Sequence, residues 1–143
     1  MKLSTKGRYG LLAMISIGSI DENLVISLKN VAEKNNISEP YLERLIARLK
    51  RAELVKSTRG SGGGYSLTKD PKLISVGDIL RASEGDLNLV DCTSENKVES
   101  CSKMKTCPSR YVFDSINKAI NEVIDNISLK DLINIEKNGA MGI

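Results

Sequence analysis

The side chains with the clearest capacity for chemistry are three cysteines, Cys92, Cys101 and Cys107, which lie in one polar stretch. Eight residues separate the first pair and five the second, so the spacing is looser than the C-x-x-C turns of structural zinc sites. It suits a larger cluster, whose thiolate ligands stand several ångströms apart. Because disulfides within one chain cannot use an odd number of cysteines, we expect reduced thiols in the cytoplasm.

The chain has no histidine, which limits what these cysteines can do. Without a histidine base to activate a thiol nucleophile, the pattern argues against an enzyme. A fourth metal ligand must be a carboxylate such as Asp91, a hydroxyl, water, a small thiol or a group from a partner subunit. The residues alone leave an iron–sulfur cluster, zinc and unligated thiols open, and they leave the fourth ligand unknown.

A second unusual feature is the glycine-rich tract at residues 59–65, RGSGGGY. It joins strand-like segments at 54–57 and 65–68, which predicts a β-hairpin that serves as a wing. If the partner of the wing is DNA, the glycines let the backbone approach its phosphates closely. Arg59 could enter the DNA minor groove where the groove narrows and negative potential is focused. The tract lacks the Lys-Ser/Thr pair of a nucleotide-binding loop. A merely flexible hairpin is the plain alternative.

The segment before this hairpin predicts a helix over residues 39–52, with Ser38 as its N-cap and Pro40 tolerated in the first turn. A shorter helix at 28–35 precedes it, and the pair forms a helix-turn-helix. Glu43 lies on the polar side, where a carboxylate discriminates between bases rather than adding affinity. The opposite, core-facing stripe consists of Leu42, Leu45, Ile46 and Leu49.

The charge distribution agrees with a nucleic-acid partner. Residues 1–82 carry 14 Lys and Arg against 8 Asp and Glu, a net +6, whereas residues 83–143 carry 7 against 10, a net −3. The basic half is where a polyanion should dock. Aromatic residues are only 3% of the chain, which argues against stacking on single strands and favours double-stranded DNA. The predicted DNA contacts are Ser38, Glu39, Pro40, Tyr41, Glu43, Arg44, Arg48, Arg59, Gly60, Ser61, Gly62 and Gly63.

We predict a mainly α fold with a small β-wing, a winged helix-turn-helix followed by a long C-terminal dimerisation helix. Apolar residues recur at helical spacing from Val112 to Ile127, a longer face than a small winged domain can cover, which indicates a homodimer seam. A helix folded back on its own core is the alternative. The predicted units are a DNA-binding domain at 1–82 with a first helix from Thr5 to about Ile20, a cysteine-containing cluster or sensor loop at 83–108, the dimerisation helix and a closing short helix at 109–135, and a disordered tail at 136–143.

The basic residues Lys2, Lys6 and Arg8 before the apolar run at 11–20 resemble a secretory signal only superficially. Ten apolar residues are far short of a membrane span, so no membrane partner is expected.

Several stretches together resemble the Rrf-type winged-helix repressors, the family that contains IscR, NsrR and CymR. They are MKLSTKGRYGLLAM at 1–14, ISEPYLERLIAR at 37–48, RGSGGGY at 59–65, SVGDILRA at 75–82, the three cysteines, and NISLKDL at 126–132. The resemblance implies a homodimeric transcription regulator of a palindromic operator, with Glu43 reading bases and Arg59 in the minor groove. It also implies a cluster, [2Fe–2S], on the three cysteines, whose status controls iron–sulfur assembly or sulfur-metabolism genes.

Two positions depart from the family's cluster ligands. Residues 108–111 follow the third cysteine where IscR has a histidine, and Arg8 stands where NsrR draws an aspartate. The alternatives are a cluster-free, CymR-like or thiol-redox regulator and a zinc-stabilised structural or adaptor protein.

Overall fold

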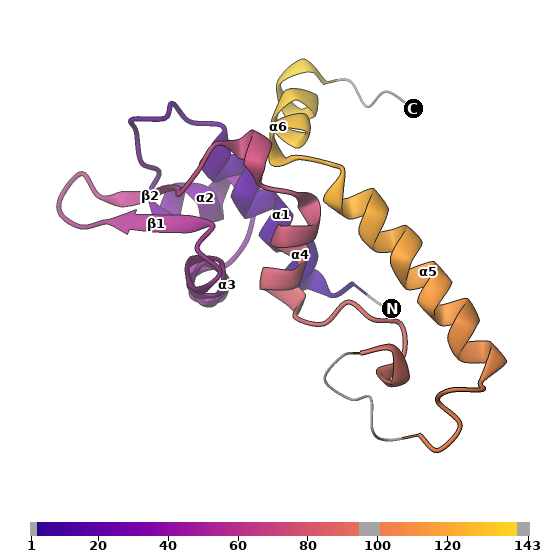
Figure 1. Ribbon diagram of the computed structural model, residues 1–143. Coiled ribbons are helices and arrows are strands. Elements are labelled where there is room, and N and C mark those ends of the chain that lie inside the picture. Colours follow the sequence, from indigo (N-terminus) through magenta and orange to yellow (C-terminus); the bar gives the residue numbers. More distant parts are fainter. Residues whose placement is uncertain (1–2, 95–100, 140–143) are drawn as a thin grey trace.

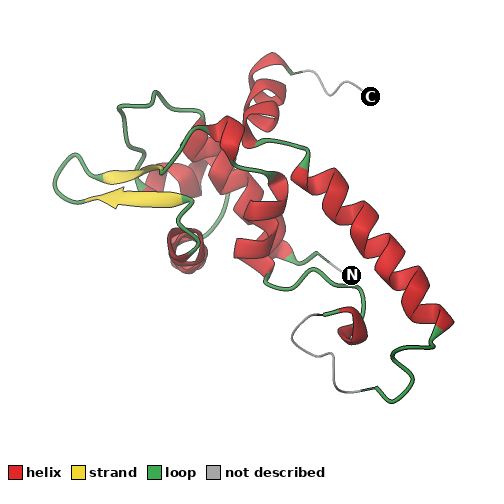
Figure 2. Cartoon of the chain, viewed as in Figure 1, coloured by secondary structure: helices red, strands yellow, loops and turns green. Residues whose placement is uncertain are grey.

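The computed structural model describes residues 3–94 and 101–139, in which helices dominate (Figures 1 and 2). The predicted fold class, mainly α with a small β-wing, is confirmed. The elements in chain order are α1 (Thr5–Gly18), α2 (Leu28–Asn35), α3 (Glu39–Arg51), the antiparallel strands β1 (Val55–Thr58) and β2 (Gly64–Leu67), the 3-10 turn η1 (Pro71–Leu73), α4 (Val76–Glu84), the 3-10 turn η2 (Asp91–Thr93), α5 (Pro108–Asp125) and α6 (Leu129–Asn138).

One hydrophobic core holds the winged domain together. The predicted stripe of α3 is buried against α1, α2 and α4, with Leu42 and Leu49 fully inaccessible. Leu129 and Ile133 of α6 are buried in the same core, although the sequence grouped this closing helix with the dimerisation helix. Each such side chain contributes roughly 1.5–3 kcal/mol through the hydrophobic effect. The last helix therefore packs into the core of the winged domain.

Helices α1 and α4 approach each other closely because small residues face α4. A Cβ atom added at Gly10 would lie 2.1 Å from the hydroxyl oxygen of Ser83, and one at Gly7 would lie 2.9 Å from a carboxylate oxygen of Glu84. Any larger residue at position 10 would have to push the two helices apart.

The starts of α4 and α6 are joined to each other. Ser75 and Ser128 form an isolated antiparallel bridge, and each begins its helix with a capping box, with Asp78 and Asp131 as the respective acidic partners. This joint fixes the C-terminal end of α5 against the winged domain.

Several element boundaries differ from the sequence predictions, and helix α3 ends at Arg51 rather than at residue 52. Helix α1 ends at Gly18 rather than near Ile20, and each strand is displaced by one residue. The predicted disordered tail at 136–143 is wrong for residues 136–138, which form the last turn of α6. That turn is held by an ion pair of 3.1 Å between Lys34 and Glu136 and ends at Gly139, in the left-handed conformation. Residues 140–143 lie outside the described residues.

Among the helices that the structure describes, none combines the length and apolar composition needed to cross a bilayer.

Candidate nucleic-acid interface and cysteine sensor

Helix α3 leaves its charged face exposed, as the sequence predicted. Ser38 caps the helix through its backbone and makes no side-chain capping hydrogen bond, which leaves its hydroxyl free to meet a phosphate at the helix N-terminus. The exposed predicted contacts on this element are Ser38, Glu39, Pro40, Glu43, Arg44 and Arg48. The fold thus leaves these six predicted contacts open to solvent, whereas Tyr41 is half-buried.

Beside this face is a hollow of about 300 Å³ lined by Lys6, Tyr41, Arg44, Leu45 and Arg48. Three of these residues are cations and none is an acid, so the hollow attracts an anionic group such as a DNA phosphate. Lys6 was not among the predicted contacts. Its basic neighbourhood was a visible signal, but only the fold places the first turn of α1 next to α3.

The side chain of Tyr41 is less available for a DNA contact than the sequence predicted. Its ring packs edge-to-face on Tyr9 with centroids 5.7 Å apart, and its hydroxyl lies 3.2 Å from the hydroxyl oxygen of Thr5. Tyr41 therefore packs between α3 and α1. A phosphate contact through its hydroxyl stays a prediction.

Glu84, at the end of α4, occupies the N-terminus of α1. Its carboxylate accepts hydrogen bonds from the backbone amides of Ser4 and Gly7, each at 2.8 Å, and from the Ser4 hydroxyl at 2.7 Å. Burial alone would raise the pKa of Glu84, but the Ser4 hydroxyl, these amides and the charge of Lys6 outweigh it and lower the pKa below 4.5. The positive end of α1 is thus already matched by a carboxylate.

The hairpin from β1 to β2 forms the wing, and Arg59, Ser61 and Gly62 are exposed in its loop. Its glycines serve different ends. Gly60 has a φ of +111°, which favours glycine, and a Cβ at Gly63 would lie 2.2 Å from the carbonyl oxygen of Thr58. These two glycines are required by the hairpin itself, whereas Gly62 has open space around it and can approach a ligand.

The three cysteines are free thiols on separate elements. Cys92 lies half-buried in η2, Cys101 is exposed in a turn, and Cys107 is the half-buried N-cap of α5. Within residues 3–94 and 101–139, no three metal-binding side chains come together as a group. Three thiolates are a donor set that suits an iron–sulfur cluster, but these three must first come closer together.

The surroundings of Cys107 favour its thiolate form. A hydrogen bond with the Ser109 hydroxyl, at 3.5 Å, is the main cause that lowers the pKa of Cys107, and the backbone amide of Arg110 and the charge of Lys103 add to it. A lowered pKa favours the thiolate, which is the form that binds metals and reacts with oxidants.

Helix α5 divides its apolar residues between two faces. Phe113, Ile120 and Ile124 lie half-buried on the side of the helix that packs against α4 and η2. A second stripe at i, i+4, i+7 and i+11 is exposed along the whole helix and consists of Val112, Ile116, Ala119 and Val123. The alternative of a helix folded onto its own core therefore describes only the first face. The second is an unpartnered apolar surface.

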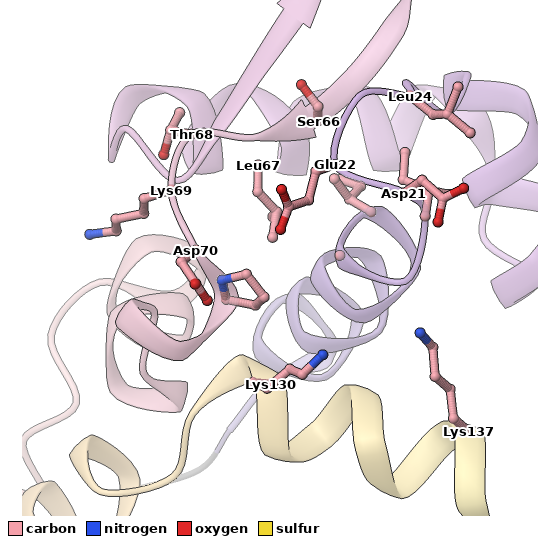
Figure 3. Close-up of a pocket in the computed structure, with 14 residues that line it drawn as sticks. Asp21, Glu22, Leu24, Ser66, Leu67, Thr68, Lys69, Asp70, Lys130 and Lys137 are labelled. Carbon is pink, nitrogen blue, oxygen red and sulfur yellow. The ribbon is translucent and has the colours of Figure 1, made fainter.

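A larger hollow of about 440 Å³ lies between the C-terminal end of α1, the end of β2 and α6 (Figure 3). Its lining mixes the acids Asp21, Glu22 and Asp70 with lysines such as Lys130 and Lys137. Mixed charge does not favour a polyanion, so this hollow is a poorer site for DNA than the basic hollow beside α3.

A helix-turn-helix with a charged recognition face and a glycine-rich hairpin defines a winged-helix DNA-binding protein. More particularly, residues 3–135 match the model of the Rrf2 family, described as iron-dependent transcriptional regulators, and the chain belongs to that family. The resemblance predicted from the sequence is confirmed. So is the prediction that the chain is not an enzyme, because its relatives are transcriptional regulators.

Relatives of two kinds share most of their length with this chain. The regulator CymR of Bacillus subtilis is 41% identical over 132 residues, 92% of this chain and 89% of that protein, and IscR of Yersinia pestis is 33% identical over 134 residues, 94% and 80%. The solved structure of B. subtilis CymR, the global cysteine regulator, has a TM-score of 0.76 at 40% identity and covers 94% of this chain and 97% of that one. T. potens IscR has a TM-score of 0.77 at 38% identity and covers 100% and 93%.

Proposed function

We propose that this chain is a homodimeric repressor, acting in the cytoplasm, that binds a palindromic operator in double-stranded DNA and changes its binding when its cysteines change state. The observation that supports a dimer is the exposed apolar stripe of α5. Exposure of this stripe to water is unfavourable, and the same stripe of a second copy would cover it. Joining two copies along this helix presents two α3 helices on one molecule. A palindrome with half-sites one helical turn apart matches that arrangement.

Two residues would discriminate between operator sequences. Glu43 projects from the exposed face of α3 and can accept from cytosine N4 while it is repelled by phosphates. Arg59 in the wing loop would enter the minor groove. The cations of the basic hollow would hold phosphates and set the position of the helix in the major groove.

We propose further that the sensor is an iron–sulfur cluster, most simply [2Fe–2S], bound by Cys92, Cys101 and Cys107. The three thiols, the family's description as iron-dependent and the likeness to T. potens IscR support this. When bound, a cluster would tie the three thiolates together. The segments that carry the three cysteines would then lie closer to α5. Because α5 forms the proposed dimer contact, the relative populations of the dimer's conformations would shift. The regulated genes would be those of iron–sulfur assembly or sulfur metabolism.

A second candidate is a cluster-free, thiol-redox regulator of the CymR type. The lowered pKa of Cys107, the separation of the three thiols and the likeness to CymR favour it. A zinc-stabilised adaptor loses support, because the chain belongs to a family of transcriptional regulators.

Anaerobic purification tests the two candidates. A brown protein with thiolate-to-iron absorbance and stoichiometric iron and sulfide, whose operator affinity differs between the loaded and metal-free forms, supports the cluster. A colourless dimer whose affinity changes only when thiols are oxidised supports the redox regulator. Replacing Cys101 by Ser should remove the colour, whereas replacing the remote Ser61 by Ala should not. A monomer that binds no DNA in low salt contradicts both candidates.

A further inference from the structure

The inner face of α5 carries a polar stripe that the sequence patterns did not reveal. Within α5, all of which the structure describes, Asn117 alone is buried, with 7% of its surface exposed. Asn121 and Asp125 follow it at i+4 and i+8, so the three side chains lie in one row.

Asn117 uses its whole amide group to hold the segment around Cys92. Its oxygen accepts from the backbone amide of Leu89 at 3.2 Å, and its nitrogen donates to the side-chain oxygens of Asn88 at 3.0 Å and Thr93 at 2.8 Å. A buried amide keeps its place only when such partners are made, because each unmet hydrogen bond is costly. Three bonds therefore anchor both sides of the first cysteine to α5.

The rest of the row connects α5 to the DNA-binding domain. Asn121 donates to the backbone oxygen of Asn117 at 2.8 Å and accepts from Arg81 of α4 at 2.8 Å. Arg81 also bonds both carboxylate oxygens of Asp125, at 2.8 and 2.9 Å. The Cys92 segment and α4 are thus attached to the same face of one rigid helix.

We infer that Asn117 is a positioning residue that holds the Cys92 segment against α5 before any ligand is bound. A change of state at the cysteines is then transmitted through α5 to α4. This inference deepens the proposed function and rests on it for the transmission step. The anchor itself rests only on the three hydrogen bonds.

Labelling the metal-free, reduced protein with iodoacetamide tests the anchor. In Asn117→Ala, Cys92 should react about tenfold faster relative to Cys101 in the same sample, because the three hydrogen bonds that hold its segment on α5 are lost and the segment opens more often. Cys107, the N-cap of α5, should react at its wild-type rate. The matched control is Asn126→Ala, since among the residues that the structure describes the Asn126 side chain bonds only to the backbone oxygen of Glu122, one turn earlier on the same helix. An unchanged Cys92 rate overturns the inference.

Operator affinity of the iron- and sulfide-reconstituted and the metal-free protein tests the transmission. The wild type should show a difference between the two forms, and Asn117→Ala should lose most of it while its metal-free affinity stays the same. If the variant keeps the full difference, the inference is overturned. If the wild type shows no difference, the proposed cluster sensor fails, and the labelling rates still decide the anchor. Should Asn117→Ala not fold, Thr93→Val should weaken the anchor and Thr93→Ser should keep it.

Discussion

Arg48 of the recognition helix donates a hydrogen bond from Nη1 to the backbone oxygen of Ser83 in α4, at 3.1 Å. Arg48 also lines the basic hollow beside α3. Arg48 therefore faces both the proposed phosphate site and the helix that carries Arg81. Its neighbour Arg44 lines the hollow too and, within the part of the chain that the structure describes, makes no side-chain hydrogen bond or ion pair. The two arginines therefore allow DNA contact and domain packing to be separated.

Replacing Arg44 by Ala should weaken operator binding and reduce the slope of log affinity against log salt by about 1, because one phosphate contact is lost. Arg48→Ala should show the same slope change and also a lower melting temperature. Fluorescence anisotropy across a salt series and thermal unfolding measure the two effects. Lys72→Ala, in exposed η1, is the control and should change neither. An unchanged slope in both arginine variants contradicts the phosphate site.

Replacing Glu43 by Ala should broaden operator choice. The variant loses the group that penalises wrong bases, and mismatched operators should gain roughly 1–3 kcal/mol relative to the best one. Mobility-shift titrations on a panel of half-site variants measure the ranking. An identical ranking for both proteins would show that Glu43 does not read bases.

Much of the recognition surface could be predicted because it depends on local patterns. The apolar spacing in α3 fixes which side is buried, and this places Glu43 and Arg44 outside without any tertiary information. The Gly-rich hairpin and the capping box at Ser75 are equally local signals. Long-range pairings carry no such signal: Lys6 approaches α3 because α1 packs on α3, and Glu84 meets Ser4 because α1 packs on α4.

The C-terminal half shows the same limit. The apolar residues of α5 predict a buried face, but their spacing alone does not reveal that one stripe packs on α4 and a second stays exposed. Asn117 interrupts the apolar pattern, and only its three partners explain why a polar residue lies there. The roles assigned to the cysteines and to the DNA contacts of the wing stay predictions.

Replacing Val123 by Asp should convert the dimer to monomers, because a charge would be buried in the proposed seam. Sedimentation equilibrium measures the association, and operator affinity should fall with it, since a monomer reaches only one half-site. Lys118→Asp changes charge on the same helix away from the exposed apolar stripe and should remain a dimer. Dimers of unaltered strength in the Val123 variant would place the interface elsewhere.

The carboxylate of Glu84 predicts a specific pH dependence of stability. Hydrogen bonds lower its pKa below 4.5 in the folded state, so its contribution to folding is complete above the ordinary pKa and is lost as the pH falls through the folded value. Glu84→Gln should reduce the free energy of unfolding at pH 7 by about 1–2 kcal/mol, because charged hydrogen bonds become neutral ones. Denaturant titrations from pH 7 to pH 3 should show the gap between variant and wild type shrinking below pH 4.5. Glu22→Gln, in the exposed loop after α1, should match the wild type throughout, and a gap for Glu84→Gln that stays constant to pH 3 would mean that its charge does not stabilise the start of α1.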